Sequence, residues 1–323
     1  MSAGIVDIAV AEVGRVVDNE HFESIGLTDE WIRRRTGISS RVWFDDDVPL
    51  AEVAAEACRP LIARMSDPTT VGALVVVSTS ARQRIPGIAQ EVAALAGLRS
   101  SVMAYDMNAA CCGFVYGLAS ALALCDSGHA KSVIVCSVEA MSRMVDSQDR
   151  QTACLFGDGA AAVLLEDRAD FSPFSHDAGC DGFAGDLMHE TGTGGIYLDG
   201  LRVYDRAVRQ LSESAERLAR LDPVPTVLVS HQANGRILEQ VRAYLVHLDI
   251  PFVNRINQVA NTSSASIPLA FVDELRAGTI AREGRLGGVA YGAGEAWGAV
   301  SVSYRIPAAP GSEHVVLRQH AVN

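Results

Sequence analysis

The chain has 323 residues, of which 49% are hydrophobic and 20% charged, so it can build a large core and is neither disordered nor fibrous. Its formal net charge of −12 argues against binding to nucleic acid or to an anionic membrane surface. No segment reaches the roughly 18 uncharged apolar residues of a membrane span, and the seven cysteines lack the spacing of a disulfide framework or metal site. We therefore expect a cytoplasmic protein without a bound metal.

Short apolar segments alternate with longer helical patterns along the chain. Residues 72–78, 132–138 and 226–230 are apolar or β-branched and are bounded by turn residues, which predicts buried strands. Helical periodicity begins at five positions, namely Pro49, Ile88, Cys111, Leu201 and Ser266. This alternation predicts an α/β layered fold.

The two halves of the chain follow a similar order. Each has a strand, then a turn of small residues that opens an apolar helix, and then a strand beside a Gly-rich turn. We therefore expect a duplicated unit. The Gly-rich stretch 177–195 is predicted to be a long loop that forms a boundary or a lid.

Two cysteines, Cys111 and Cys112, stand where a loop gives way to an apolar helix. The unpaired N–H groups and the positive dipole end of a helix start favour a thiolate, so either cysteine could be a nucleophile. Free cysteine is also a common packing residue in protein cores. That second role is the one we expect for Cys58, Cys125, Cys136, Cys154 and Cys180.

Three further segments carry polar groups that could serve chemistry. His231 ends an apolar strand, where open α/β folds gather ligand groups. Asn261 precedes an apolar helix, in a turn that corresponds to the cysteine turn of the first half, so duplication would bring Asn261 and Cys111 to one cavity. An ordinary helix cap or turn is the alternative for Asn261. The turn of residues 291–298 is Gly-rich without GxGxxG spacing, which favours backbone N–H contacts over a dinucleotide site.

Four separated motifs together resemble one family. They are DMNAACCGF, SHQANGRI, ANTSSAS and YGAGEAWG, and they resemble the ketosynthase III group of condensing enzymes, the β-ketoacyl-acyl carrier protein synthase III type. The resemblance runs from about Asp7 to Arg305. It implies a thiolase-like duplicated fold with α-β-α-β-α layers, in which an N-terminal half, 1–168, holds the nucleophile and a C-terminal half, 169–323, holds the histidine and asparagine.

The resemblance also implies roles for single residues. Cys111 would be the nucleophile and Cys112 a packing neighbour, with His231 and Asn261 completing a Cys, His, Asn triad. The backbone N–H groups of Cys111 and Ala293 would form the oxyanion hole. The implied reaction loads an acyl group from acyl-CoA onto Cys111 and condenses it with a malonyl thioester on an acidic acyl carrier protein, with loss of CO₂ and no cofactor beyond the CoA substrate.

The same resemblance implies contacts for CoA, for the carrier protein and for a second subunit. Trp31 and Arg150 would hold the adenine, Thr28 and Arg35 would lie nearby, and Asn234 would approach the pantetheine arm. Arg236 would help dock the carrier protein. Ile85 would cap the acyl pocket of the neighbouring subunit, so the family pattern implies a homodimer.

Two positions depart from the family pattern. Asp205 stands where a lysine usually assists carrier docking, and Leu201 replaces an asparagine near the pantetheine arm. Arg202, Arg206 and Arg209 on the same predicted helix could form a shifted docking patch or a solvated face. These departures favour a specialised relative in polyketide or other secondary synthesis over a fatty-acid starter enzyme.

Other functions stay open at this point. An acyltransferase could pass the acyl group to an alcohol, an amine or a carrier thiol without condensation. A Cys/His/Asn hydrolase could use the same residue types, and a noncatalytic carrier-binding scaffold would use none of them.

Overall fold

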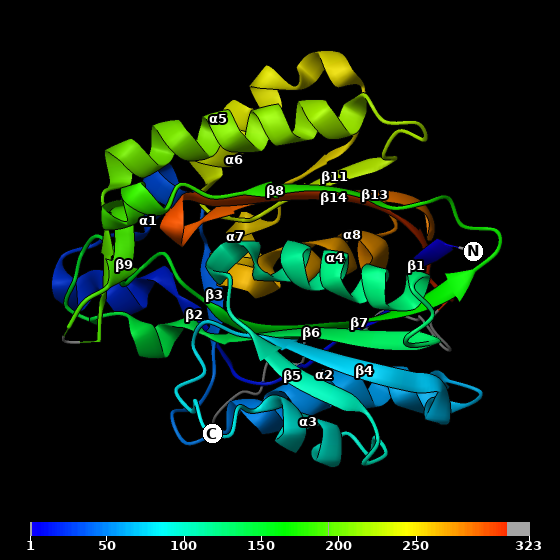
Figure 1. The fold of residues 1–323 in the computed structure, drawn as a ribbon. Helices are drawn as coiled ribbons and strands as arrows, with labels where there is room; N and C mark the ends of the chain where they lie inside the picture. Colours follow the sequence, from blue (N-terminus) through cyan, green and yellow to red (C-terminus); the bar gives the residue numbers. More distant parts are fainter. Residues whose placement is uncertain (1, 193, 309–323) are drawn as a thin grey trace.

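The computed structural model describes residues 2–192 and 194–308, which form five stacked layers of alternating helices and sheets (Figure 1). Two β layers, called the lower and the upper sheet below, face each other and are joined into one ten-stranded sheet where the first and last strands pair. Two helices lie between the layers, and further helices cover the outer face of each layer. The predicted α/β layered architecture is confirmed.

The first repeat forms the lower sheet of Figure 1. Its elements are β1 (Ser2–Val10), α2 (Leu50–Arg64), β4 (Val71–Val77), α3 (Ala89–Leu95), β5 (Met103–Met107), α4 (Gly113–Asp126), β6 (Ser132–Ala140) and β7 (Asp158–Arg168). The strand order is β5-β4-β6-β7-β1, in which β5, β4 and β6 are parallel and β7 is antiparallel to both of its neighbours.

The second repeat forms the upper sheet. Its elements are β8 (Ser175–Gly179), α5 (Gly200–Ala219), β11 (Val227–Ser230), α6 (Gly235–Tyr244), β12 (Phe252–Val253), α8 (Ser266–Ala277), β13 (Glu283–Gly292) and β14 (Ala296–Arg305). The order β12-β11-β13-β14-β8 and the strand directions match those of the first repeat. This match confirms the predicted duplication. The predicted division at residue 168 falls between β7 and β8.

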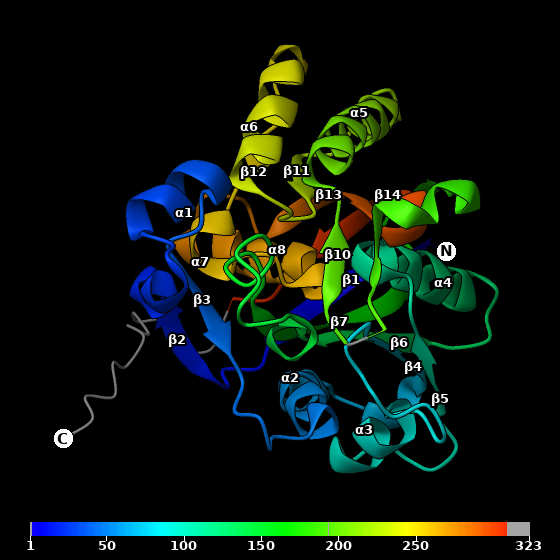
Figure 2. The ribbon, with the colours of Figure 1, turned by 90° about the vertical axis from the view of Figure 1, so that its left-hand side faces the viewer.

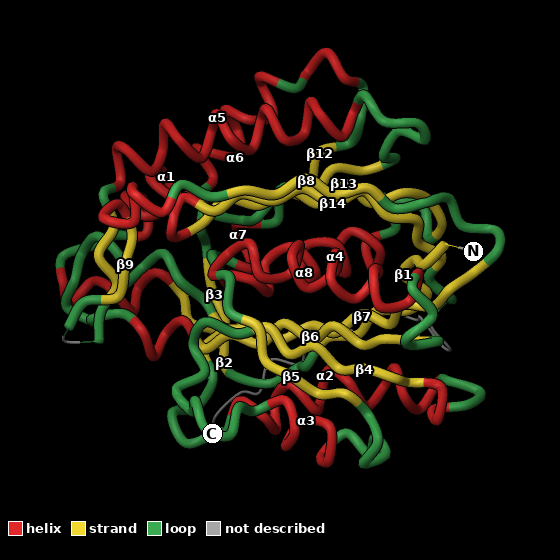
Figure 3. Tube along the Cα trace, in the orientation of Figure 1, coloured by secondary structure: helices red, strands yellow, loops and turns green. Residues whose placement is uncertain are grey.

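The helices α4 and α8 lie between the two sheets, as Figure 3 shows. α4 buries residues on most of its circumference, including Phe114 and Leu118, because both of its sides face a sheet. Phe271 of α8 joins the same core with Val163 and Val300 from the two sheets. The first residues of both helices, Gly113 and Ser266, are buried, so both helix starts lie in the interior.

Smaller elements cover one end of the layers. They include β2 (Arg15–Asp18), α1 (Asp29–Thr36), β3 (Ser40–Trp43) and α7 (Ile256–Val259), with α7 packed against β3 (Figure 2). The prediction of a long loop over 177–195 is wrong in its described part, because this stretch holds the end of β8, a 3-10 turn η5 (Gly182–Leu187) and β9 (Met188–Glu190). β9 pairs with β10 (Ile196–Leu198). In the described part of the chain, no helix has the length and apolar character to cross a bilayer.

Candidate active site

The two adjacent cysteines lie in a 3-10 turn, η3 (Ala110–Cys112), that leads directly into α4. Ala110 has a φ of +47°, a conformation that non-glycine residues rarely adopt. Cys112 is fully buried, and its Sγ donates a hydrogen bond to the Ala296 carbonyl oxygen at 3.2 Å. Cys112 is thus a packed neighbour, as expected, whereas Cys111 keeps a small exposed fraction of 7%.

The second repeat builds the same turn before α8. Its 3-10 turn η7 (Ser263–Ala265) begins with Ser263 at a φ of +48°, matching Ala110 of the first repeat. η3 and η7 contact each other, and the Ser263 side chain hydrogen-bonds the Cys111 thiol. Asn261 is buried, and its Oδ1 accepts a hydrogen bond from the Ser263 N–H at 3.0 Å. The structure therefore brings the cysteine turn and the asparagine turn together.

His231 directly follows β11 and is 2% exposed. Its Nδ1 lies 2.6 Å from the Ser266 hydroxyl oxygen, so Nε2 is the nitrogen left for a substrate. Ser266 also accepts a hydrogen bond from the Gln232 N–H at 3.2 Å and lies 2.9 Å from the Ser263 carbonyl oxygen. The motif ANTSSAS contains Ser263 and Ser266, but the sequence does not single them out, because nothing in a run of small polar residues distinguishes the member that meets the histidine.

Burial keeps both candidate reacting groups uncharged. It raises the pKa of the Cys111 thiol to about 12, an effect that the hydrogen bond with Ser263 opposes and the charge of Glu139 reinforces. Burial also lowers the pKa of His231 to about 4, against a hydrogen bond with the Ser263 backbone. Near neutral pH the pair is thus a thiol and a neutral imidazole.

Glu139, at the end of β6, is a fully buried carboxylate that connects the two repeats. It accepts hydrogen bonds from Ser264 Oγ at 2.6 Å, from Ser80 Oγ at 2.8 Å and from the Thr79 N–H at 3.0 Å. Burial raises its pKa, and these donors partly offset that rise. Glu139 therefore fixes the η7 turn against the loop after β4, and no motif in the sequence pointed to it.

The Gly-rich turn passes close to Cys111. A Cβ atom placed on Gly292 would lie 3.0 Å from the Cys111 Cβ and 3.1 Å from the Cys111 nitrogen, so only glycine fits there. Ala293 follows and opens the 3-10 turn η8 (Ala293–Glu295). The predicted oxyanion donors, Cys111 and Ala293, therefore lie on segments in van der Waals contact.

An arginine-rich cavity of about 390 Å³ opens at the surface beside α1. Its lining residues are Trp31, Arg34, Arg35 and Arg236. The Arg35 guanidinium carbon lies 5.5 Å from the centroid of the Trp31 ring, within the range of a cation–π contact. Three of the four residues were predicted to meet CoA or the carrier protein, and Arg34 is an addition that the charge pattern did not single out.

The other predicted CoA contacts are anchored around this region. The Thr28 hydroxyl accepts a hydrogen bond from the Trp31 N–H at 3.2 Å and caps α1. Arg150 donates to the Gly26 carbonyl oxygen at 2.9 Å, and the Asn234 side chain caps α6 by accepting from the Arg236 N–H. These contacts are structural, and a role in CoA binding stays a prediction.

Three predicted surface residues have different surroundings. Ile85 is 95% exposed in this single chain, and Arg209 is exposed on α5. Arg206 is not free on the helix face as predicted, because its guanidinium pairs with the buried carboxylate of Glu295. Cys180, expected to be a packing residue, is exposed.

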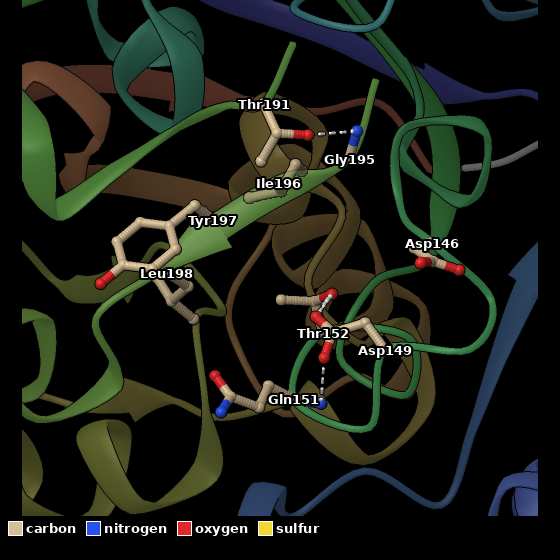
Figure 4. A pocket seen from close by; sticks show the side chains of 9 residues that line it. All are labelled: Asp146, Asp149, Gln151, Thr152, Thr191, Gly195, Ile196, Tyr197 and Leu198. Atoms are coloured by element: carbon tan, nitrogen blue, oxygen red, sulfur yellow. Dashed lines mark hydrogen bonds between the residues drawn. The ribbon is translucent and has the colours of Figure 1, made fainter. Parts of the chain in front are cut away.

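A second cavity of about 340 Å³ lies between the segment before β7 and the β9–β10 hairpin (Figure 4). Asp146, Asp149, Gln151 and Thr152 line one side, and Tyr197 is among the hairpin residues opposite. The Asp149 carboxylate accepts hydrogen bonds within its own turn, from Thr152 Oγ1 and the Gln151 N–H. This turn fixes the position of Arg150, which lies between Asp149 and Gln151 in the sequence.

Neither cavity is lined by Cys111, His231 or Asn261, all of which are more than nine-tenths buried. Within residues 2–192 and 194–308, no group of three or more histidine, cysteine or acidic side chains could hold a metal ion.

Comparison with known proteins decides the family. Residues 105–182 match the model described as 3-oxoacyl-[acyl-carrier-protein (ACP)] synthase III, and residues 225–304 match the C-terminal model of the same family. A relative from Halalkalibacterium halodurans, named beta-ketoacyl-[acyl-carrier-protein] synthase III 1, is 36% identical over 94% of this chain and 98% of its own length. This chain belongs to the 3-oxoacyl-[acyl-carrier-protein] synthase III family.

Solved structures of synthase III proteins share the fold. The enzyme from Pseudomonas aeruginosa superposes with a TM-score of 0.86 at 33% identity, covering 94% of this chain and 99% of that one. The priming β-ketosynthase of the R1128 polyketide pathway gives 0.86 at 26% identity, covering 95% and 97%. The predicted family and thiolase-like fold are confirmed, and the chain is an enzyme of the transferase class.

Proposed function

We propose that this chain catalyses an initiating condensation in fatty-acid or polyketide synthesis. It takes an acyl group from acyl-CoA onto Cys111 and joins that group to a malonyl unit carried by an acyl carrier protein. The observation that carries the proposal is the contact of the cysteine turn with the asparagine turn, from equivalent positions of the two repeats, next to His231. Membership of the synthase III family supports the same reaction.

The first half-reaction is acyl transfer to Cys111. The sulfur attacks the thioester carbonyl, a new C–S bond forms, the C–S bond to CoA breaks, and the thiol proton ends on the CoA sulfur. Because burial holds the thiol pKa at about 12, the proton leaves during the attack rather than before it. The N–H groups of Cys111 and Ala293 stabilise the oxyanion.

The second half-reaction is decarboxylative condensation. The malonyl thioester loses CO₂, and the resulting enolate carbon attacks the acyl-Cys111 carbonyl to give a β-ketoacyl thioester and free Cys111. Stabilising the enolate oxygen requires hydrogen-bond donors, which the His231 Nε2–H and the Asn261 amide can supply. In the structure the Ser266 hydroxyl donates to the Ser263 carbonyl oxygen at 2.9 Å. For Nε2 to carry the proton, this hydroxyl must turn and donate to Nδ1, which lies 2.6 Å from its oxygen.

The substrates need a positive surface on an acidic protein. With a net charge of −12, the chain repels an acidic carrier protein or the CoA phosphates except where basic residues gather. Arg34, Arg35 and Arg236 gather around the cavity beside Trp31 and form the docking surface that we propose for both. The 95% exposure of the large apolar Ile85 supports a homodimer in which a second copy covers it.

The test is intact-protein mass spectrometry after exposure to a panel of acyl-CoAs, followed by malonyl-loaded carrier protein. We expect one acyl adduct, which Cys111→Ala abolishes and Cys112→Ala retains, and then malonyl-dependent release of CO₂ with a β-keto product. An adduct that passes to an acceptor without CO₂ would replace condensation by simple acyl transfer. Release as free acid would indicate a hydrolase, and no adduct would indicate a scaffold.

A further inference from the structure

The turn after β13 contains a buried carboxylate in an unusual backbone conformation. Glu295 is 4% exposed and has a φ of +51°, in the left-handed region that non-glycine residues rarely occupy. The same turn uses glycine at Gly294, where φ is +75°, so the chain places a charged side chain where another glycine would suit the backbone. Such a residue persists only when its side chain makes contacts that hold it.

Both oxygens of this carboxylate are occupied. The Tyr291 hydroxyl donates to Oε1, and the Arg206 guanidinium donates to Oε2 at 2.5 Å. Arg206 comes from α5, the outer helix that covers β13 and β14, and its side chain remains one-third exposed. Removing one partner of a buried ion pair strongly destabilises the folded protein. The pair of Arg206 and Glu295 therefore fixes the turn to α5.

The end of β13, directly before this turn, lies against the nucleophile. Gly292 is pressed against Cys111, with 3.0 Å between a Cβ placed on it and the Cys111 Cβ. Ala293 lies in the sequence between this close contact and the anchored Glu295. Any shift of Glu295 therefore displaces the backbone N–H of Ala293 relative to Cys111.

We propose that Arg206, Glu295 and Tyr291 are positioning residues that hold the Ala293 N–H at the place where the acyl oxygen develops charge. The inference rests on the proposed function, in which Ala293 is an oxyanion donor. Oxyanion donors act because they are fixed before the reaction, and a displacement of about 1 Å can cost roughly 100-fold in rate. Arg206 thus acts on the chemical step rather than on the carrier protein.

The test compares Arg206→Met and Glu295→Gln with Arg217→Met. Arg217 is a matched control, because it lies on the same helix and pairs with a carboxylate, that of Asp177 on β8, at 2.6 Å. Acylation is measured with the acyl-CoA that labels Cys111 most fully, carrying ¹³C at its carbonyl. We expect the acylation rate at saturation to fall about 10- to 100-fold in the two test variants, with KM changed less than threefold, and to stay native in the control.

The decisive readout is the carbonyl stretch of the acyl enzyme in isotope-edited infrared spectra. Loss of a hydrogen bond to the carbonyl oxygen moves this band to higher frequency, and we expect that shift in both test variants and a smaller one in Arg206→Lys. The proposal would be overturned if a folded, acylated test variant showed its carbonyl band at the frequency of the native protein. It would also be overturned if a variant with this unchanged band showed a raised KM for the carrier protein. If either test variant fails to fold, Tyr291→Phe and Arg206→Lys answer the same question by the same band. A native protein that takes no label would refute the proposed function itself, before any variant is compared.

Discussion

The ionisation of Cys111 tests the electrostatics of the site most directly. Burial raises its thiol pKa to about 12, so at pH 8 roughly one molecule in ten thousand carries the thiolate. Alkylation by iodoacetamide requires the thiolate. We therefore expect the alkylation rate of Cys111 to rise about tenfold for each pH unit from 7 to 10, without a plateau.

Two substitutions should move this rate in opposite directions. Glu139→Gln removes a negative charge that disfavours the thiolate, so the pKa falls and alkylation at a given pH becomes faster. Ser263→Ala removes a hydrogen bond that favours the thiolate, so the pKa rises and alkylation becomes slower. Peptide mass mapping assigns the modification, and the exposed Cys180 reports in each sample that the reagent is active.

A plateau below about pH 8 would refute this reasoning, since it would mean that Cys111 rests as a thiolate beside an imidazolium, the arrangement of many cysteine hydrolases. Equal rates in the native protein and both variants would show that neither Glu139 nor Ser263 acts on the thiol. Either outcome would remove the argument that the proton moves only during attack on the thioester.

Three further predictions concern the same region. The pKa of His231 is lowered from an ordinary 6.5 to about 4, so as the pH falls the unfolded chain takes up a proton before the folded protein does. The free energy of unfolding, measured by urea titration, should therefore drop by about 3 kcal/mol between pH 6.5 and 4. The same titrations of His231→Gln should lack that part of the drop. Gly292→Ala should reduce the acylation rate at least 100-fold in a stopped-flow assay, because the added Cβ would displace Cys111. The circular dichroism spectrum should stay that of the native protein. An unchanged acylation rate would contradict the close contact between Gly292 and Cys111. Asn261→Ala should still form the acyl enzyme but release CO₂ from malonyl-carrier protein at least 100-fold more slowly, and equal losses in both steps would assign Asn261 a structural role.

The layered fold was predictable because its strands are short apolar segments and its helices have clear periodicity. β4, β6 and β11 lie within one or two residues of their predicted ranges at 72–78, 132–138 and 226–230. The β9–β10 hairpin was missed, since Met188–Glu190 and Ile196–Leu198 are too short to show alternation and the glycines between and before them resemble a loop. The duplication was visible because equivalent turns precede both central helices.

The site was predictable only at the level of segments. Sequence motifs located the turns of Cys111 and Asn261, since small residues before an apolar helix form a recognisable pattern. They did not reveal Ser266 or Glu139, whose importance depends on which atoms they meet after folding: Ser266 meets His231, 35 residues away, and Glu139 meets Ser264, 125 residues away. Contacts at that sequence separation leave no periodic pattern in a single chain.

Arg206 shows why a charge pattern on a helix can mislead. Arg202, Arg206 and Arg209 share one face of the helix, and this spacing predicts a basic surface. Such a surface could either dock the carrier protein or simply face solvent. The position of Arg206 depends instead on its ion pair with Glu295, which lies 89 residues along the chain. In the sequence, Glu295 is only one member of a Gly-rich motif. A buried carboxylate requires a cation from a neighbouring element, and α5 is the element that packs on β13 and β14. The basic face is therefore divided, because Arg206 is bound to the interior whereas Arg209 is exposed.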